Sequence, residues 1–146
     1  MGQYITRKQT WAGNEIIQTD IGLLPDKIWK SQLRNYPTEL LSLIRKSLLE
    51  KVPDLGEKFN QAGLYFGYRV GNRKDKAYIY VQKKNLIIDL CISRNFTTEL
   101  KKPGFEVRYR DNFQGRARWL TGWRIPQSTL NLKPAVKWLC KALEKR

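Results

Sequence analysis

The hydrophobic pattern of this chain changes from a helical period to an alternating one after Gly63. Short segments rich in aromatic and β-branched residues then follow one another, separated by the turns Gly71–Asp75 and Lys83–Asn85. Closely spaced strands joined by short turns pair in the antiparallel sense. The pattern predicts strands at Leu64–Val70, Ala77–Gln82, Leu86–Ile92, Phe105–Arg110 and Arg116–Ile125.

Helical patterns lie on both sides of the predicted strands. Apolar residues recur every three or four positions from Leu40 to Leu48 and predict an amphipathic helix over about Thr38–Lys51. A shorter helix is expected from Asp26, and a closing helix over about Leu132–Lys145. This order predicts an α+β fold, in which an antiparallel sheet of about five strands packs against N-terminal helices and a C-terminal helix.

The length of 146 residues predicts a single domain, since domains usually have about 100 to 150 residues. Residues 1–37 are expected to form an N-terminal arm and a short helix, and residues 38–146 the α+β domain proper. Within the arm, residues 1–24 are interpreted as an irregular segment or a short hairpin. The sequence has no internal repeat and no low-complexity tract that would mark a linker.

Several classes of protein are excluded by composition. The chain has no histidine, which excludes Ser-His and Cys-His nucleophile pairs and histidine-based metal sites. Its two cysteines, Cys91 and Cys140, lie in apolar patterns and are interpreted as buried thiols. No apolar stretch reaches the about 20 residues of a membrane-spanning helix. We therefore expect a soluble, cytoplasmic protein without cofactor or metal. One alternative is an N-myristoylated membrane-surface protein, because Met1–Thr6 matches the acylation pattern.

The chain carries a large excess of positive charge, with 28 Lys and Arg against 13 Asp and Glu, a formal net charge of +15. Residues 1–63 carry a net +2, residues 64–100 a net +4, and residues 101–146 a net +9. Such an excess destabilises a compact state by self-repulsion and attracts polyanions. The composition therefore predicts an anionic partner bound by the C-terminal third.

Five arginines concentrate in the predicted hairpin at 105–125. They are Arg108 and Arg110 on its first strand, and Arg116, Arg118 and Arg124 on its second. A five-residue loop would place Arg110 opposite Arg116 and Arg108 opposite Arg118, although opposed like charges destabilise a sheet. Arginine binds phosphate through a planar, bidentate fork. We interpret this face as a phosphate-backbone contact; the alternative is an edge hairpin whose arginines prevent aggregation.

Two tryptophans lie on the same hairpin. The alternation places Trp119 and Trp123 on the face opposite the arginines, which favours a role in the core. A bulge at Gly122 would reverse this phase and allow base stacking.

Lysines extend the basic surface beyond the hairpin. Lys133, Lys137, Lys141 and Lys145 are spaced four residues apart and form one ridge of the last helix. Lys83 and Lys84 occupy a predicted turn. The alternative for the ridge is an ordinary solvated helix face.

A nuclease is the catalytic alternative. Asp89, Glu99 and Lys101 fit the letters of the carboxylate–metal pattern D…(D/E)xK. That pattern needs Glu99 and Lys101 on a strand beside Asp89, whereas residues 97–104 are predicted to be a loop.

Residues 38–146 resemble a known module. The strings TELLSLIRKSLLEKVPDL, LYFGYRV and AYIYVQKKNLIIDLCIS are followed by Gly122-Trp123 and a final helix. This arrangement is similar to the uncharacterised module labelled "predicted transport protein", which ends prokaryotic proteins linked to nucleases and restriction systems. The resemblance implies a prokaryotic restriction or defence context and favours DNA over RNA.

The sequence thus predicts a non-catalytic nucleic-acid-binding module that contacts the phosphate backbone, most of all through the arginine-rich hairpin. A metal-dependent nuclease and a basic protein-interaction domain remain as alternatives.

Overall fold

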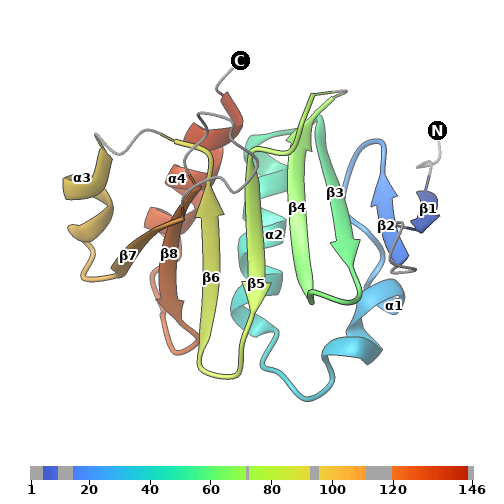
Figure 1. Cartoon of the computed structure of the whole chain (residues 1–146), viewed down its shortest axis with the longest axis horizontal. Helices are drawn as coiled ribbons and strands as arrows, with labels where there is room; N and C mark the ends of the chain where they lie inside the picture. The colour runs from blue at the N-terminus through green and yellow to red at the C-terminus, as the bar shows by residue number, and fades with distance from the viewer. Residues whose placement is uncertain (1–4, 10–14, 72, 93–95, 111–119, 145–146) are drawn as a thin grey trace.

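The computed structural model describes residues 5–9, 15–71, 73–92, 96–110 and 120–144 (Figure 1). Its strands form one sheet in the order β1-β2-β3-β4-β5-β6-β8-β7, and all neighbours pair antiparallel. The strands are β1 (Ile5–Gln9), β2 (Glu15–Thr19), β3 (Leu55–Asn60), β4 (Tyr65–Val70), β5 (Ala77–Val81), β6 (Asn85–Leu90), β7 (Glu106–Arg110) and β8 (Leu120–Pro126).

The fold is α+β, but the expectation of about five strands is wrong, because the sheet has eight. The antiparallel pair β1–β2 confirms the short hairpin that was one of two interpretations of residues 1–24, but its place in the main sheet was not expected, and neither was the strand β3. β3 shows no apolar alternation because Glu57 stands between Leu55 and Phe59 on its inward face, and all three side chains are fully buried. In β2, Ile16 and Ile17 are adjacent and point to opposite faces, so no alternation appears there either.

The helices agree with their sequence patterns more closely. They are α1 (Asp26–Trp29), continued by the 3₁₀-helix η1 (Lys30–Leu33), then α2 (Glu39–Lys51), α3 (Thr97–Lys101) and α4 (Lys133–Glu144). α2 and α4 lie within about a residue of their predicted bounds, since each carries a continuous apolar stripe. The short α3 occupies a segment predicted to be a loop.

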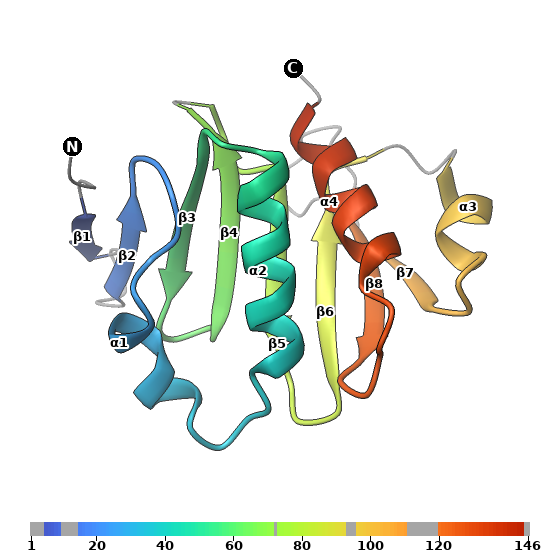
Figure 2. The same cartoon turned by 180° about the vertical axis from the view of Figure 1, so that it is seen from behind.

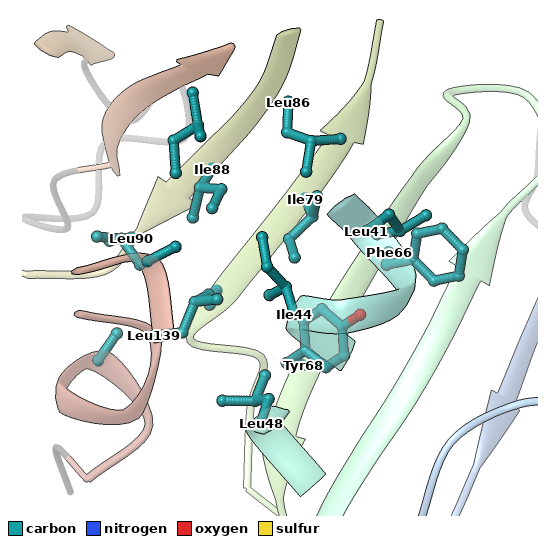
Figure 3. Close-up of a cluster of buried hydrophobic side chains, with 14 of the residues drawn as sticks. Leu41, Ile44, Leu48, Phe66, Tyr68, Ile79, Leu86, Ile88, Leu90 and Leu139 are labelled. Carbon is teal, nitrogen blue, oxygen red and sulfur yellow. The ribbon is translucent and has the colours of Figure 1, made fainter. Parts of the chain in front are cut away.

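One face of the sheet carries the core. α2 and α4 lie side by side on this face (Figure 2). Apolar side chains of both helices, among them Leu41, Ile44 and Leu139, meet those of the central strands, such as Phe66 and Ile88 (Figure 3). No helix of the described residues lies on the opposite face, which Figure 1 shows from the front. We call this second surface the open face.

A buried ion pair joins α2 to the sheet. The Arg45 guanidinium donates from Nε to Glu57 Oε2 (2.8 Å) and from Nη2 to Glu57 Oε1 (2.7 Å). The same carboxylate accepts hydrogen bonds from the Tyr68 hydroxyl (2.7 Å) and the Leu24 amide (2.8 Å). Glu57 and Tyr68 are fully buried, and Arg45 is 3% exposed. Four donors therefore satisfy a carboxylate that would otherwise be very costly to bury.

Aromatic rings enclose the guanidinium. Arg45 Cζ lies 4.7 Å from the centroid of the Trp29 ring and 5.4 Å from that of Phe66. Arg45 Nη2 also donates to the carbonyl of Leu24 (2.9 Å). Burial alone would lower the pKa of Arg45, but the hydrogen bonds and charge of Glu57 outweigh it and raise this pKa above its ordinary value. The arginine therefore stays charged and holds α1, α2 and β3 together.

Replacing Arg45 by Met should lower the free energy of unfolding by about 3 to 5 kcal/mol, because Glu57 would keep its buried charge without a cation. Urea unfolding followed by circular dichroism measures this loss. Arg7→Gln breaks the exposed Arg7–Glu15 pair and should cost no more than about 1 kcal/mol. Equal losses in the two variants would contradict the structural role of Arg45.

The fold should also weaken in alkali through Tyr68. Burial, followed by the charge of Glu57, raises the pKa of Tyr68 well above its ordinary value of 10.0. Above that pH the unfolded chain loses the phenolic proton while the folded chain keeps it, so stability falls as pH rises. The stability advantage of wild type over Tyr68→Phe should therefore shrink above about pH 10. A difference that stays constant from pH 8 to 11 in urea titrations would contradict this linkage.

Candidate functional site

The arginine hairpin pairs differently from the expected register. β7 and β8 place Arg108 opposite Gly122 and Arg110 opposite Leu120. The expected pairs Arg108–Arg118 and Arg110–Arg116 are therefore wrong, because each arginine of β7 already has another partner in β8. Arg116, Arg118 and Trp119 lie outside the described residues. Arg108 and Arg110 are placed by their backbone pairing alone, at the edge of the sheet.

Arg124 lies on the open face. Its side chain is 38% exposed, and its Nε lies 3.8 Å from Glu106 Oε2, on the residue opposite it in β7. The partner of this arginine within the hairpin is thus an acid. An exposed pair of this length stabilises the fold little and leaves Arg124 available to another anion.

Trp123 belongs to the core. Its side chain is fully buried, its Nε1 donates to the carbonyl of Leu100 (3.1 Å), and its ring meets Phe105 edge-on with 5.2 Å between centroids. The core interpretation of Trp123 is confirmed, and the alternative of base stacking by this residue is wrong, since no surface of the ring is accessible.

The lysine ridge lies on the helical side of the molecule. Lys133 and Lys137 are exposed, and Lys141 is half-buried with its Nζ 4.5 Å from the centroid of Phe96 and 5.4 Å from that of Trp138. A groove of about 970 Å³ runs along α4 beside them. Its charged lining consists of Lys51, Lys102, Lys133, Lys137, Glu99 and Glu144.

The predicted site residues therefore do not form one surface. The α4 lysines lie on the helical side, Arg124 lies on the open face, and Lys83 and Lys84 are exposed at the β5–β6 turn. Lys145 lies outside the described residues.

The open face carries a cationic hollow that sequence reasoning missed. This hollow, of about 390 Å³, is lined by Gln18, Lys58, Arg69, Arg73, Lys74, Asp75 and Tyr78. Lys58 Nζ lies 2.6 Å from Asp75 Oδ2, and Arg69 Nη1 lies 3.9 Å from Asp75 Oδ1. Lys58 and Arg69 share this carboxylate, and Arg73 and Lys74 add two further cations to the lining, so the hollow keeps a positive charge.

Gly67 allows this arrangement. It pairs with Lys58 on one side and with Tyr78 on the other. A Cβ at this position would lie 2.7 Å from Lys58 Cε and 3.0 Å from Lys58 Cγ. Because glycine has no side chain, Lys58 crosses the strand closely and reaches Asp75.

Three tyrosines lie beside the hollow. Tyr65 and Tyr80 are opposite each other in β4 and β5, with 4.9 Å between ring centroids, and Tyr78 meets Tyr65 edge-on at 5.9 Å. All three are half-buried. The sequence does contain a signal for this cluster, since Tyr78 and Tyr80 alternate with the apolar Ala77, Ile79 and Val81 and so had to face away from the core.

The residues of the nuclease alternative lie on different elements. Asp89 is buried on β6, whereas Glu99 and Lys101 are exposed on the helix α3, not on a strand beside β6. Among the described residues, no three Asp, Glu or Cys side chains gather as a metal-binding group. Cys91 and Cys140 are half-buried thiols rather than fully buried ones. Burial raises the pKa of the Cys140 thiol above its ordinary value.

Comparisons with known proteins give no match: no family model, no curated protein and no solved structure is similar to this chain. The resemblance of residues 38–146 to the "predicted transport protein" module therefore stays a prediction. In the described part of the chain, every helix is too short or too polar to cross a membrane.

Removing the single carboxylate of the hollow should strengthen its attraction for polyanions. We expect Asp75→Asn to elute from a heparin column at higher salt than wild type, because Lys58 and Arg69 lose their intramolecular partner. Its stability should fall by about 1 to 3 kcal/mol, because the side chains of this ion pair are largely buried. Glu50→Gln makes the same change of charge on exposed α2 and is the matched control. An equal shift in both variants would mean that only the net charge matters.

Proposed function

We propose that this protein is a non-catalytic nucleic-acid-binding module that contacts the phosphate backbone. The observation that carries the proposal is the cationic hollow, which Lys58, Arg69, Arg73 and Lys74 line together with a single acid, on the face that no helix of the described residues covers. The net charge of +15 supplies the long-range attraction for a polyanion.

The side chains of the hollow suit phosphate. Arg73 and Lys74 are exposed at the turn between β4 and β5, so their side chains are accessible to a ligand. Arg69 is held by Thr19, whose carbonyl accepts from Nη2 (2.6 Å). A guanidinium fixed in this way loses little conformational entropy when it binds an anion.

Other basic residues extend the proposed contact. Arg124 lies on the same face, and the remaining hairpin arginines, Arg108, Arg110, Arg116 and Arg118, belong to the proposal on the strength of their charge and sequence position. The α4 lysines would serve as a secondary surface. DNA as the preferred nucleic acid, a restriction or defence context and a cytoplasmic location are parts of the proposal that rest on sequence alone.

The dependence of affinity on salt tests this function. If about six phosphates are neutralised, the slope of log affinity against log salt should be about −5 for a duplex and about −4 for a single strand. Arg73→Gln/Lys74→Gln should reduce the slope by between about one and two. Fluorescence anisotropy of labelled oligonucleotides over a series of KCl concentrations gives both values.

The control is Lys27→Gln/Lys30→Gln, which removes the same charge from exposed positions of α1 and η1. It should leave the slope close to that of wild type. Absence of binding to every oligonucleotide at low salt would overturn the proposal. Capture of an acidic protein under the same conditions would then favour a basic protein-interaction domain.

A further inference from the structure

We propose that the open face binds single-stranded nucleic acid, with Tyr65, Tyr78 and Tyr80 as a platform on which unpaired bases stack. This inference rests on the proposed nucleic-acid-binding function and specifies the strandedness of the ligand and the surface that receives it.

The tyrosines occupy a position that the fold itself does not require. The uncovered face of an antiparallel sheet usually carries polar side chains. Here one cross-strand row of this face contains Asn60, Tyr65, Tyr80, Ile87 and Arg124. The next row contains Gln18, Lys58, Gly67, Tyr78 and the buried Asp89. Aromatic rings are thus concentrated at the centre of the face, and aromatic side chains are the groups on which proteins stack unpaired bases.

The rings are held in place before any ligand arrives. The Tyr65 hydroxyl accepts a hydrogen bond from Asn60 Nδ2 (3.3 Å), and its ring leans over Gly63, where a Cβ would lie 2.6 Å from Tyr65 Cδ2. Tyr80 packs against Tyr65. Binding a base to such a surface therefore costs little side-chain entropy.

Cationic side chains lie close to the tyrosine rings. Lys58 Nζ is 5.6 Å from the centroid of the Tyr78 ring and also lines the hollow with Arg69, Arg73 and Lys74. At the other end of the tyrosine row, Arg124 stands next to Ile87. A strand that crosses this face could place its phosphates on these cations and its bases on the rings.

The phenol group of Tyr78 does not oppose an anionic ligand. Burial, followed by the charges of Asp75 and Cys91, raises the pKa of Tyr78 well above its ordinary value. This ring therefore stays neutral at physiological pH, and its hydroxyl remains a hydrogen-bond donor.

The combination favours a single strand over a duplex. Stacking on an aromatic side chain needs an exposed base face, which a duplex keeps inside its own stack. A ligand that is bound through its phosphates alone would make no contact with the tyrosine rings. Every base offers a π-face, so binding should depend little on sequence.

The experiment compares single-stranded and double-stranded ligands. Fluorescence anisotropy is measured with a labelled 20-nucleotide single-stranded DNA of mixed sequence, its RNA equivalent and the matching DNA duplex, at one salt concentration. Wild type should bind both single strands at least tenfold more tightly than the duplex. The DNA and RNA arms show which backbone is preferred.

Tyr80→Leu should weaken binding of the single strands by about tenfold or more, the factor expected for one lost base stack, and leave the duplex affinity unchanged. Tyr80→Phe keeps the ring and should restore binding to within about twofold. Tyr36→Leu changes a half-buried tyrosine packed against the core and is the matched control. Thermal melting of each variant confirms that it is folded.

The outcomes separate this inference from the proposed function. Equal affinity for single strands and duplex, with no effect of Tyr80→Leu, would overturn the stacking platform and leave phosphate binding intact. Loss of binding to all three ligands in wild type would overturn both. A salt slope that is unchanged in Tyr80→Leu but reduced in Arg73→Gln/Lys74→Gln would support the proposal that the rings bind bases and the cations bind phosphates.

Discussion

The pair of Arg45 and Glu57 is the interaction on which the arrangement of this fold depends. It places one full charge from α2 and one from β3 in the buried interior, and each charge is acceptable only while the other is present. The carboxylate also binds Tyr68 of β4 and the backbone of Leu24. One carboxylate thereby connects a helix, two strands and the segment that leads into α1, which specifies how α2 sits on the sheet.

The position of α2 in turn makes the two faces of the sheet different. Beside it, α4 completes the cover of one face, and nearly all of the apolar burial takes place there. The other face does not contribute to this core. It can hold tyrosines, a lysine that lies across Gly67 and the cations that line the hollow with Asp75, which under a helix would each need a buried partner such as the one that Glu57 provides.

The hairpin at 105–125 shows where sequence reasoning fails. Alternation correctly placed Trp123 in the core, because side chains alternate between the two faces of a strand whichever residues lie opposite them. The pairing of the arginines depended on the expected five-residue loop, and the observed pairing of Arg110 with Leu120 does not fit that length. An error in loop length changes every cross-strand pair of a hairpin at once. The tyrosines were missed for a different reason. Alternation in β5 shows that Tyr78 and Tyr80 point away from the core, but the role of such a ring depends on which face of the sheet the helices leave open.

The sequence by itself determined the elements whose pattern is local. α2, α4 and the meander β4–β6 follow from periodicity, and the excess of positive charge follows from composition. Only the tertiary structure decided that β3 exists, that β8 lies between β6 and β7, and that Lys58, Arg69 and Arg73 converge. The physical reason is that these features depend on partners far apart in the chain. Glu57 in β3 resembles a surface residue until Arg45 and Tyr68 supply the hydrogen bonds that permit its burial.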